Sequence, residues 1–260
     1  MDTLHAHHET DDGLFGIVCI LLNGGMKIRE MAKMDAVLVV VCKRPRPGMG
    51  KQRLAVGFGI EQAMACAQAL LDCALEDALA WRGPVVIAPA SSGDRAWAAS
   101  LLPPQSMVTI QPQGTGNLGQ RLNELDRSLR LNGAKQLIYI GSDAPLLTDE
   151  DYSACRAALM HADTVLIPAF DGGVVLMASN LPWPELGHLP WSTPHLGATL
   201  MEQCRQAGQT VACLKPNVDI DEPEQIEQLY ADLRHDSRPA RRRLHALVSC
   251  LRANKRVNHA

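Results

Sequence analysis

The chain has 260 residues, and 47% of them are apolar, which is enough for one sizeable core and excludes disorder as the main state. A formal net charge of −3 lacks the strong positive field of a general nucleic-acid binder, so we expect no nucleic-acid partner. The eight cysteines form no CxxC pair and no Cys/His spacing that suits zinc, which favours buried free thiols.

Residues 1–34 are expected to form a poorly ordered N-terminal extension, because they are detached from the periodic pattern that follows. The apolar run over 14–22 is too short to span a bilayer. It follows Glu9, Asp11 and Asp12, where an export signal would carry positive charge. We therefore expect no transmembrane span and a cytoplasmic protein.

One domain is predicted over residues 35–233, where short β-branched runs alternate with segments of helical period. The predicted strands cover 36–41, 85–88, 107–111, 136–140, 164–168, 174–178 and 210–214. The predicted helices cover about 60–78, 94–101, 117–131, 148–161, 195–207 and 222–233. This alternation is typical of βα units and predicts an α/β domain with a mostly parallel sheet.

Residues 234–260 are predicted to be a basic C-terminal tail. Basic residues are frequent there, among them Arg238, Arg241, Arg242, Arg243, Arg252, Lys255 and Arg256. The stretch from Arg241 to Val248 fits an amphipathic helix that would touch an acidic partner or a membrane surface. We expect a solvated tail instead.

The loop at 42–54 follows the first predicted strand, and in open parallel sheets ligands bind outside the carboxyl ends of strands. Glycines and prolines give it a close-approaching backbone, and its cations suit phosphate oxygens. A P-loop is excluded, because Pro45 stands at the first glycine position and Gln52 at the hydroxyl position. The phosphate-binding candidates of this loop are Lys43, Arg46, Gly48, Lys51 and Arg53.

A glycine-rich stretch leads into the helix predicted at 117–131. Gly114 and Gly116 would let the backbone approach a nucleotide near a helix N-terminus, although the spacing is not GxGxxG. A plain glycine-rich turn remains the alternative interpretation.

Three carboxylates are metal-ligand candidates. Asp143 comes at the end of an apolar strand, well placed to hold Mg²⁺ or Mn²⁺ against phosphate oxygens, with a turn cap as the alternative. Asp219 and Asp221 project the same way if the chain is extended, and could share that metal. Asp221 is alternatively the N-cap of the last predicted helix.

Two later motifs complete the candidate site. Asp171 precedes two glycines, beside a permissive backbone, and is our candidate general base. Trp191, Ser192 and Thr193 follow a proline and are candidates for an acceptor contact or a loop at the site.

Taken in order, these motifs resemble a bacterial family in the glycosyltransferase-A superfamily, the radical-SAM/selenodomain-associated or DUF2064-type transferases, which are related to nucleotidyltransferases. The resemblance runs from about Ala36 to Leu233 through motifs at 43–54, 113–121, 141–147, 171–173, 190–193 and 219–226. It implies a three-layer α/β/α nucleotide-diphospho-sugar transferase fold of the GT-A, Rossmann-like type.

The resemblance also implies site roles. Lys43, Lys51 and Arg53 would bind nucleotide phosphates, while Asp143, with Asp219 and Asp221, would hold the metal. The chain departs from the family pattern in three places: Gln52 replaces a threonine, Ala144 replaces a cysteine, and valines replace the aromatics after the DGG motif.

The function expected from the sequence is a metal-dependent transferase that uses a nucleotide-activated donor, in first place a glycosyltransferase acting on a nucleotide-sugar and a small-molecule acceptor. One alternative is a nucleotidyltransferase that joins an NTP to a phosphorylated small acid and releases pyrophosphate. Another is a non-catalytic nucleotide-binding domain. The sequence leaves the base, the sugar, the acceptor and the oligomeric state open.

Overall fold

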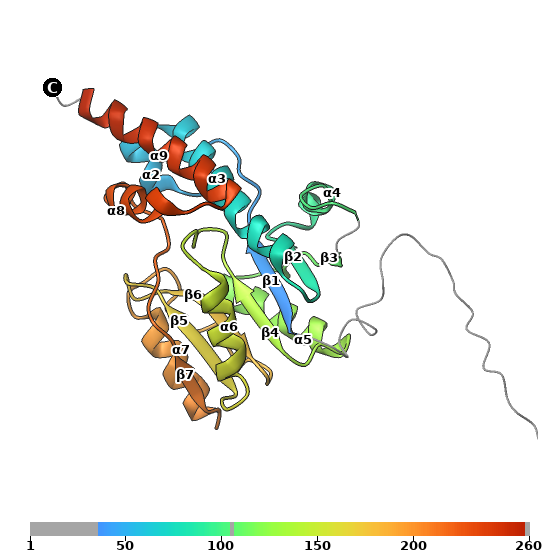
Figure 1. Ribbon diagram of the computed structural model, residues 1–260. Coiled ribbons are helices and arrows are strands. Elements are labelled where there is room, and N and C mark those ends of the chain that lie inside the picture. Colours follow the sequence, from blue (N-terminus) through green and yellow to red (C-terminus); the bar gives the residue numbers. More distant parts are fainter. Residues whose placement is uncertain (1–35, 105–106, 258–260) are drawn as a thin grey trace, which may run out of the picture.

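The computed structural model describes residues 36–104 and 107–257, so the extension expected at 1–34 lies outside the described residues (Figure 1). The described strands form one sheet in the order β3-β2-β1-β4-β6-β5-β7. They are β1 (Val37–Cys42), β2 (Val85–Pro89), β3 (Val108–Ile110), β4 (Leu137–Ile140), β5 (Thr164–Pro168), β6 (Val174–Ser179) and β7 (Val211–Cys213). Only β6 pairs antiparallel with its neighbours, so the sheet is mostly parallel, as predicted.

The helices of the described chain agree with the predicted ones within a few residues and add two. They are α2 (Gln52–Phe58), α3 (Ile60–Ala80), α4 (Arg95–Ala99), α5 (Leu118–Leu131), α6 (Asp149–Ala158), α7 (Leu196–Gln206), α8 (Gln225–Asp232) and α9 (Pro239–Val257). Asn117 and Thr148 each form a capping box, which fixes where α5 and α6 begin. Helices α2 and α9 are the additions.

Helices cover both faces of the sheet. Alternate residues of β1 point to opposite faces: Leu38 and Val40 pack with α3, α4 and α6, whereas Val37 and Val39 pack with α5 and α7. The protein therefore has the three-layer α/β/α fold that the sequence predicted.

A third apolar cluster lies outside these layers and joins α2, α3, α8 and α9. Leu244, Val248 and Leu251 recur every three or four residues along α9, and all three are buried, so the helix packs along α3 (Figure 1). The structure thus differs from the solvated tail that we expected over 234–260. Burying each large apolar side chain of this stripe stabilises the fold by about 1.5–3 kcal/mol. This gain keeps the helix on the domain despite its many basic residues.

The parallel strands bring their carboxyl ends to one edge of the sheet. The loops after β1, β2, β3, β4 and β7 therefore gather there, and the turn from β5 into the antiparallel β6 lies at the same edge. All the loops that carry predicted site residues are at or near this edge. Across the described ranges, no helix has the length and apolar character needed to cross a bilayer.

Candidate functional site

The loop after β1 is a tight turn with several left-handed residues. Met49 donates its backbone N–H to the Arg46 carbonyl at 3.0 Å. Gly48 and Gly50 have φ of 70° and 76°, and Lys51 itself has φ of 45°. A left-handed lysine is strained, because its Cβ crowds the backbone. The loop holds Lys51 in this conformation as the N-cap of α2.

The side chain of Lys51 joins three loops at the edge of the sheet. Its ammonium lies 3.2 Å from an Asp143 carboxylate oxygen and 2.5 Å from one of Asp221. Burial alone would lower the pKa of Lys51, but the charges of Asp143 and Asp221 outweigh it and raise that pKa above its ordinary value. Lys51 is therefore a fixed cation at the centre of the predicted site.

Backbone contacts hold the carboxylates in place. The Ile220 N–H donates to the Asp143 carbonyl at 2.9 Å, and the Ile220 side chain is fully buried. In an extended segment Asp219 and Asp221 then project away from the apolar cluster. Gln225 accepts from the Asp221 N–H at 2.7 Å and donates to the Asp219 carbonyl at 2.8 Å. No Asp221 side-chain cap is formed, since Glu224 is the N-cap residue of α8, and that alternative was wrong.

Asp219 reveals an excess of negative charge. Burial and then the nearby charges of Asp171, Asp143 and Asp221 together raise its pKa to about 6. We call these four aspartates the acidic cluster: Asp143, Asp171, Asp219 and Asp221. Four carboxylates against one ammonium favour an additional cation, and carboxylate oxygens are the ligands that Mg²⁺ and Mn²⁺ prefer. Among residues 36–104 and 107–257, however, no three His, Cys, Asp or Glu side chains are already arranged as a metal site.

The remaining cations of the first loop are paired elsewhere or exposed. Arg46 donates to Asp94, after β2, at 2.6 Å. Arg53 donates to Glu222 at 3.0 Å, an exposed pair, and Lys43 is exposed. The structure thus brings Lys51 to the acidic cluster, while the other two predicted arginines contact separate carboxylates at the same edge.

Backbone conformation requires one glycine of the second loop, Gly116, which has φ of 91°. A Cβ on Gly114 would lie 1.6 Å from a Glu124 carboxylate oxygen, at the end of a flexible side chain that can move aside. Next to them, buried Gln113 donates to the Ala88 carbonyl at 2.8 Å. Its Oε1 has no hydrogen-bond partner among the described residues, so an acceptor is left over at this end of the sheet.

The two later motifs pack on each other. A Cβ on Gly172 would lie 2.0 Å from the Pro194 carbonyl oxygen, and Asp171 accepts from the Gly173 N–H at 2.8 Å. The Trp191 indole N–H donates to the Leu186 carbonyl at 2.9 Å, so its polar atom is used within the protein. Ser192 and Thr193 are exposed, Ser192 in the left-handed region. They directly precede Pro194, whose carbonyl lies against Gly172.

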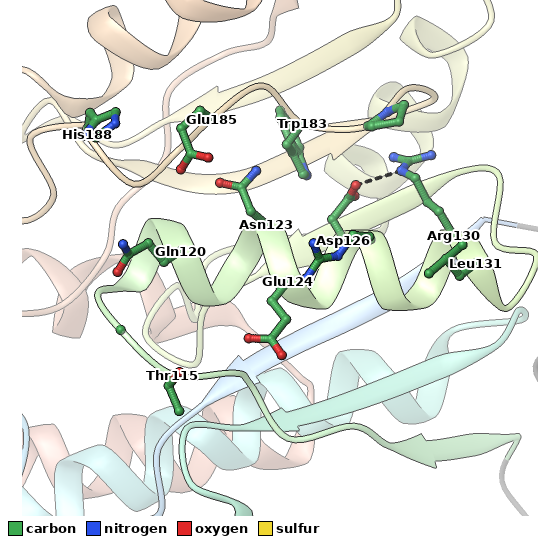
Figure 2. Close-up of a pocket in the computed structure, with 13 residues that line it drawn as sticks. Thr115, Gln120, Asn123, Glu124, Asp126, Arg130, Leu131, Trp183, Glu185 and His188 are labelled. Carbon is green, nitrogen blue, oxygen red and sulfur yellow. Dashed lines mark hydrogen bonds and ion pairs between the residues drawn. The ribbon is translucent and has the colours of Figure 1, made fainter.

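A groove of about 940 Å³ runs over α5 and shares only Thr115 and Gly116 with the loops discussed above (Figure 2). Several of its polar side chains are satisfied within the protein, although the buried Trp183 Nε1–H has no hydrogen-bond partner among the described residues. Asp126 accepts from Arg130 at 2.9 Å and from Tyr139 at 3.1 Å. Asn123 ties down the facing loop by bonds to Pro184 and Leu186. This groove is therefore a weaker candidate than the edge where unbalanced charges meet.

Sequence comparison gives two matches. The family model "Uncharacterized protein conserved in bacteria (DUF2064)" matches residues 74–193. A phosphoenolpyruvate guanylyltransferase from Chloroflexus aggregans is 32% identical over 143 residues, which is 54% of this chain and 69% of the relative.

Solved structures share the fold. A protein of Desulfovibrio desulfuricans G20, described as a nucleotide-diphospho-sugar transferase, has a TM-score of 0.72 and 22% identity over 86% of this chain and 98% of its own. A cytidylyltransferase from Leptospira borgpetersenii has a TM-score of 0.51 and 12% identity over 84% of this chain and 95% of its own. Together with the sequence matches, they identify the fold as that of nucleotide-diphospho-sugar transferases. The chain belongs to the DUF2064 family of nucleotidyl- and sugar-transferase-like enzymes.

Proposed function

We propose that the protein transfers a nucleotidyl group from a nucleoside triphosphate to a phosphorylated small acid and releases pyrophosphate. The observation that carries this proposal is the meeting of Lys51, from a glycine-rich basic loop, with the acidic cluster at one edge of the sheet. Lys51 and its loop suit a polyphosphate, and the acidic cluster suits a divalent cation. The guanylyltransferase relative supports GTP as the donor.

The residues present fit a divalent cation. Asp143, Asp219 and Asp221 would hold Mg²⁺ or Mn²⁺, because their oxygen donors match the preference of these ions and the Lys51 ammonium is the cation that pairs with this cluster of four carboxylates. When bound, the ion would neutralise charge on the donor phosphates.

The chain's own residues act on the phosphates. Lys51 would bind the donor's β- and γ-phosphates and stabilise the charge that develops on the leaving pyrophosphate. Lys43 and Arg53 would add charge at the rim, and the backbone of Gly48 leaves room for phosphate oxygens. An acceptor oxygen forms a bond to the α-phosphorus, the bond from that phosphorus to the β-bridging oxygen breaks, and its electron pair leaves with pyrophosphate.

The chemistry of the acceptor decides what Asp171 does. A phosphate monoester has a second pKa of about 6, so its oxygen is already ionised at neutral pH and needs no general base. Asp171 would then act on the cation side of the site, by adding to the negative charge of the acidic cluster near Asp219. A sugar acceptor with a hydroxyl nucleophile would instead need Asp171 as the base that we expected from the sequence.

Glycosyl transfer, which the sequence ranked first, is the rival. It shares the donor-binding edge, but it releases a nucleoside diphosphate from a nucleotide-sugar. The likeness to the Desulfovibrio protein concerns the fold alone and does not favour either reaction.

A two-stage experiment tests the proposal. A thermal-shift screen of NTPs, NDPs and nucleotide-sugars, with and without Mg²⁺ or Mn²⁺, names the donor, because ligands that bind only the folded state raise Tm. We expect a metal-dependent shift with GTP. Pyrophosphate release is then measured with a panel of phosphorylated acids. Release of a nucleoside diphosphate from a sugar conjugate would favour the rival, and binding without turnover would favour a non-catalytic domain.

A further inference from the structure

Arg241, on the first turn of α9, is a buried arginine with partners on α3 and on the loop after β4. Its side chain has no exposed surface. Nε donates to the Pro145 carbonyl at 3.0 Å, and Nη1 donates to the Cys73 carbonyl at 2.6 Å. The same guanidinium forms ion pairs with Glu76 at 3.0 Å and Asp77 at 2.7 Å on α3.

These contacts reach the loop that carries Asp143. Pro145 is two residues beyond Asp143, and Leu147 is four residues beyond it. Arg238, one turn before Arg241, donates to the Leu147 carbonyl at 2.8 Å. Two arginines at the start of α9 thus hold two carbonyls of the loop, while Ile220 holds the carbonyl of Asp143 itself.

The acidic partners on α3 offset the free-energy cost of burying the charge of Arg241. Burial alone would lower the pKa of Arg241, but Asp77 and Glu76 raise it, so the guanidinium stays charged. Tyr152 donates to Asp77 at 3.0 Å and completes the group. Only a planar fork with several donors can serve the carboxylates and both carbonyls at once.

We propose that Arg241, assisted by Arg238, is a positioning residue that fixes the Asp143 loop beneath the acidic cluster. Helix α9 is then part of the scaffold of the site rather than an appendage to the domain. The inference rests on the proposed function in one respect, that Asp143 contacts the ligand. The anchoring of the loop itself is independent of that function.

The substitution Arg241→Lys separates charge from anchoring. Lysine keeps a positive charge beside Glu76 and Asp77, but it loses the Nε–H that holds Pro145. Arg130→Lys is the matched control. Arg130 is also largely buried, pairs with Asp126, and donates to the Lys135, Ser179 and Asn180 carbonyls, all remote from the Asp143 loop.

Hydrogen exchange measures the anchoring without any ligand. In Arg241→Lys we expect exchange in peptides covering 141–148 and 218–221 to accelerate by about tenfold, and in Arg130→Lys we expect it to change only near 130–135 and 179–180. Equal exchange at 141–148 in wild type and Arg241→Lys would overturn the proposal. If Arg241→Lys does not fold, Arg238→Gln replaces it, because Arg238 is partly exposed and has its own bond to the loop.

Binding links the anchoring to the site. The dissociation constant of GTP with Mn²⁺, measured by calorimetry well below Tm, should rise by about tenfold in Arg241→Lys and by less than about twofold in Arg130→Lys. Equal weakening in both variants would mean a merely structural role and would overturn the proposal. If wild type binds no nucleotide while the exchange result holds, the proposed function fails and the anchoring stands.

Discussion

Two ionic clusters lie on either side of the Asp143 loop, and they are built differently. The acidic cluster is partly exposed: the side chains of Asp143 and Asp221 are 36% and 43% accessible, and Lys51 is their shared cation. The Arg241 cluster, made of Glu76, Asp77, Tyr152, Arg238 and Arg241, is mostly buried.

The difference is seen in what shifts the pKa of one carboxylate in each cluster, Asp219 in the acidic cluster and Asp77 in the Arg241 cluster. Burial raises the pKa of Asp219, and three further carboxylates raise it more. Burial also raises the pKa of Asp77, but Arg241, Tyr152 and Arg238 all oppose that rise. A cluster whose charges balance stabilises the fold, whereas one with surplus charge of a single sign is suited to bind a ligand of the other sign. Substitutions in the Arg241 cluster should therefore lower mainly the stability of the fold, whereas substitutions in the acidic cluster should lower mainly ligand binding.

The largest expected effect on stability is in the balanced cluster. Arg241→Met leaves Glu76 and Asp77 buried without their main cation, and breaking such a pair costs about 3–5 kcal/mol. Urea unfolding followed by circular dichroism measures it. Arg243→Met, an exposed neighbour on the same helix, should stay within about 0.5 kcal/mol of wild type. A loss below about 1 kcal/mol for Arg241→Met would contradict the comparison.

In the acidic cluster the largest effect should be on binding. Asp143→Ala removes a carboxylate proposed to hold the cation, and even outer partners of metal ligands are worth about 10–100-fold. We expect metal-dependent nucleotide affinity to fall by about 100-fold or more in calorimetry. Unchanged affinity and unchanged metal dependence would remove Asp143 from the site.

Asp171→Asn distinguishes the two acceptor chemistries. With a phosphorylated acid as acceptor, we expect kcat to fall by less than about tenfold, because the attacking oxygen is already ionised. With a hydroxyl acceptor, loss of a general base would cost about 10²–10⁴-fold. Steady-state kinetics on the donor and acceptor pair found in the screen decides between them.

The smallest expected effect is on the free energy of unfolding, which most substitutions lower but Asp219→Asn should leave equal or raise. Asp219→Asn removes one of four mutually repelling carboxylates, so in metal-free buffer the free energy of unfolding should stay equal or rise by up to about 1 kcal/mol. Chemical unfolding in the presence of EDTA measures it. A clear loss of stability would mean that the charges of this cluster are balanced after all.

The fold and the convergence of the aspartates could be predicted from the sequence. Strand period and helical period are local signals, and Asp143, Asp219 and Asp221 each come after a strand whose carboxyl end faces the same edge. The bridging role of Lys51 could not be predicted, because it depends on a left-handed backbone and on loops more than 90 residues apart.

Helix α9 shows why the basic composition of residues 234–260 led to the wrong prediction of a solvated tail. Its apolar stripe was visible in the sequence, yet the surrounding arginines suggested solvent. Arg241 is buried because Glu76 and Asp77, more than 160 residues earlier, come to meet it. No local pattern reports such a partner. Trp191 is a similar case, since its indole N–H bonds to Leu186 within the same loop.

The antiparallel strand β6 has a consequence for how such a protein changes over time. It makes the turn at 169–173 a hairpin tip, with both of its strands anchored inside the sheet. Because β6 pairs with β4 as well as with β5, its register does not depend on the tip alone, so exposed tip residues such as Phe170 are free to vary, whereas Gly172 packs against Pro194 and is not. The Lys51 loop, in contrast, is fixed by strained backbone and by ion pairs. Relatives can therefore diversify what they accept at this tip while the phosphate-binding side stays the same.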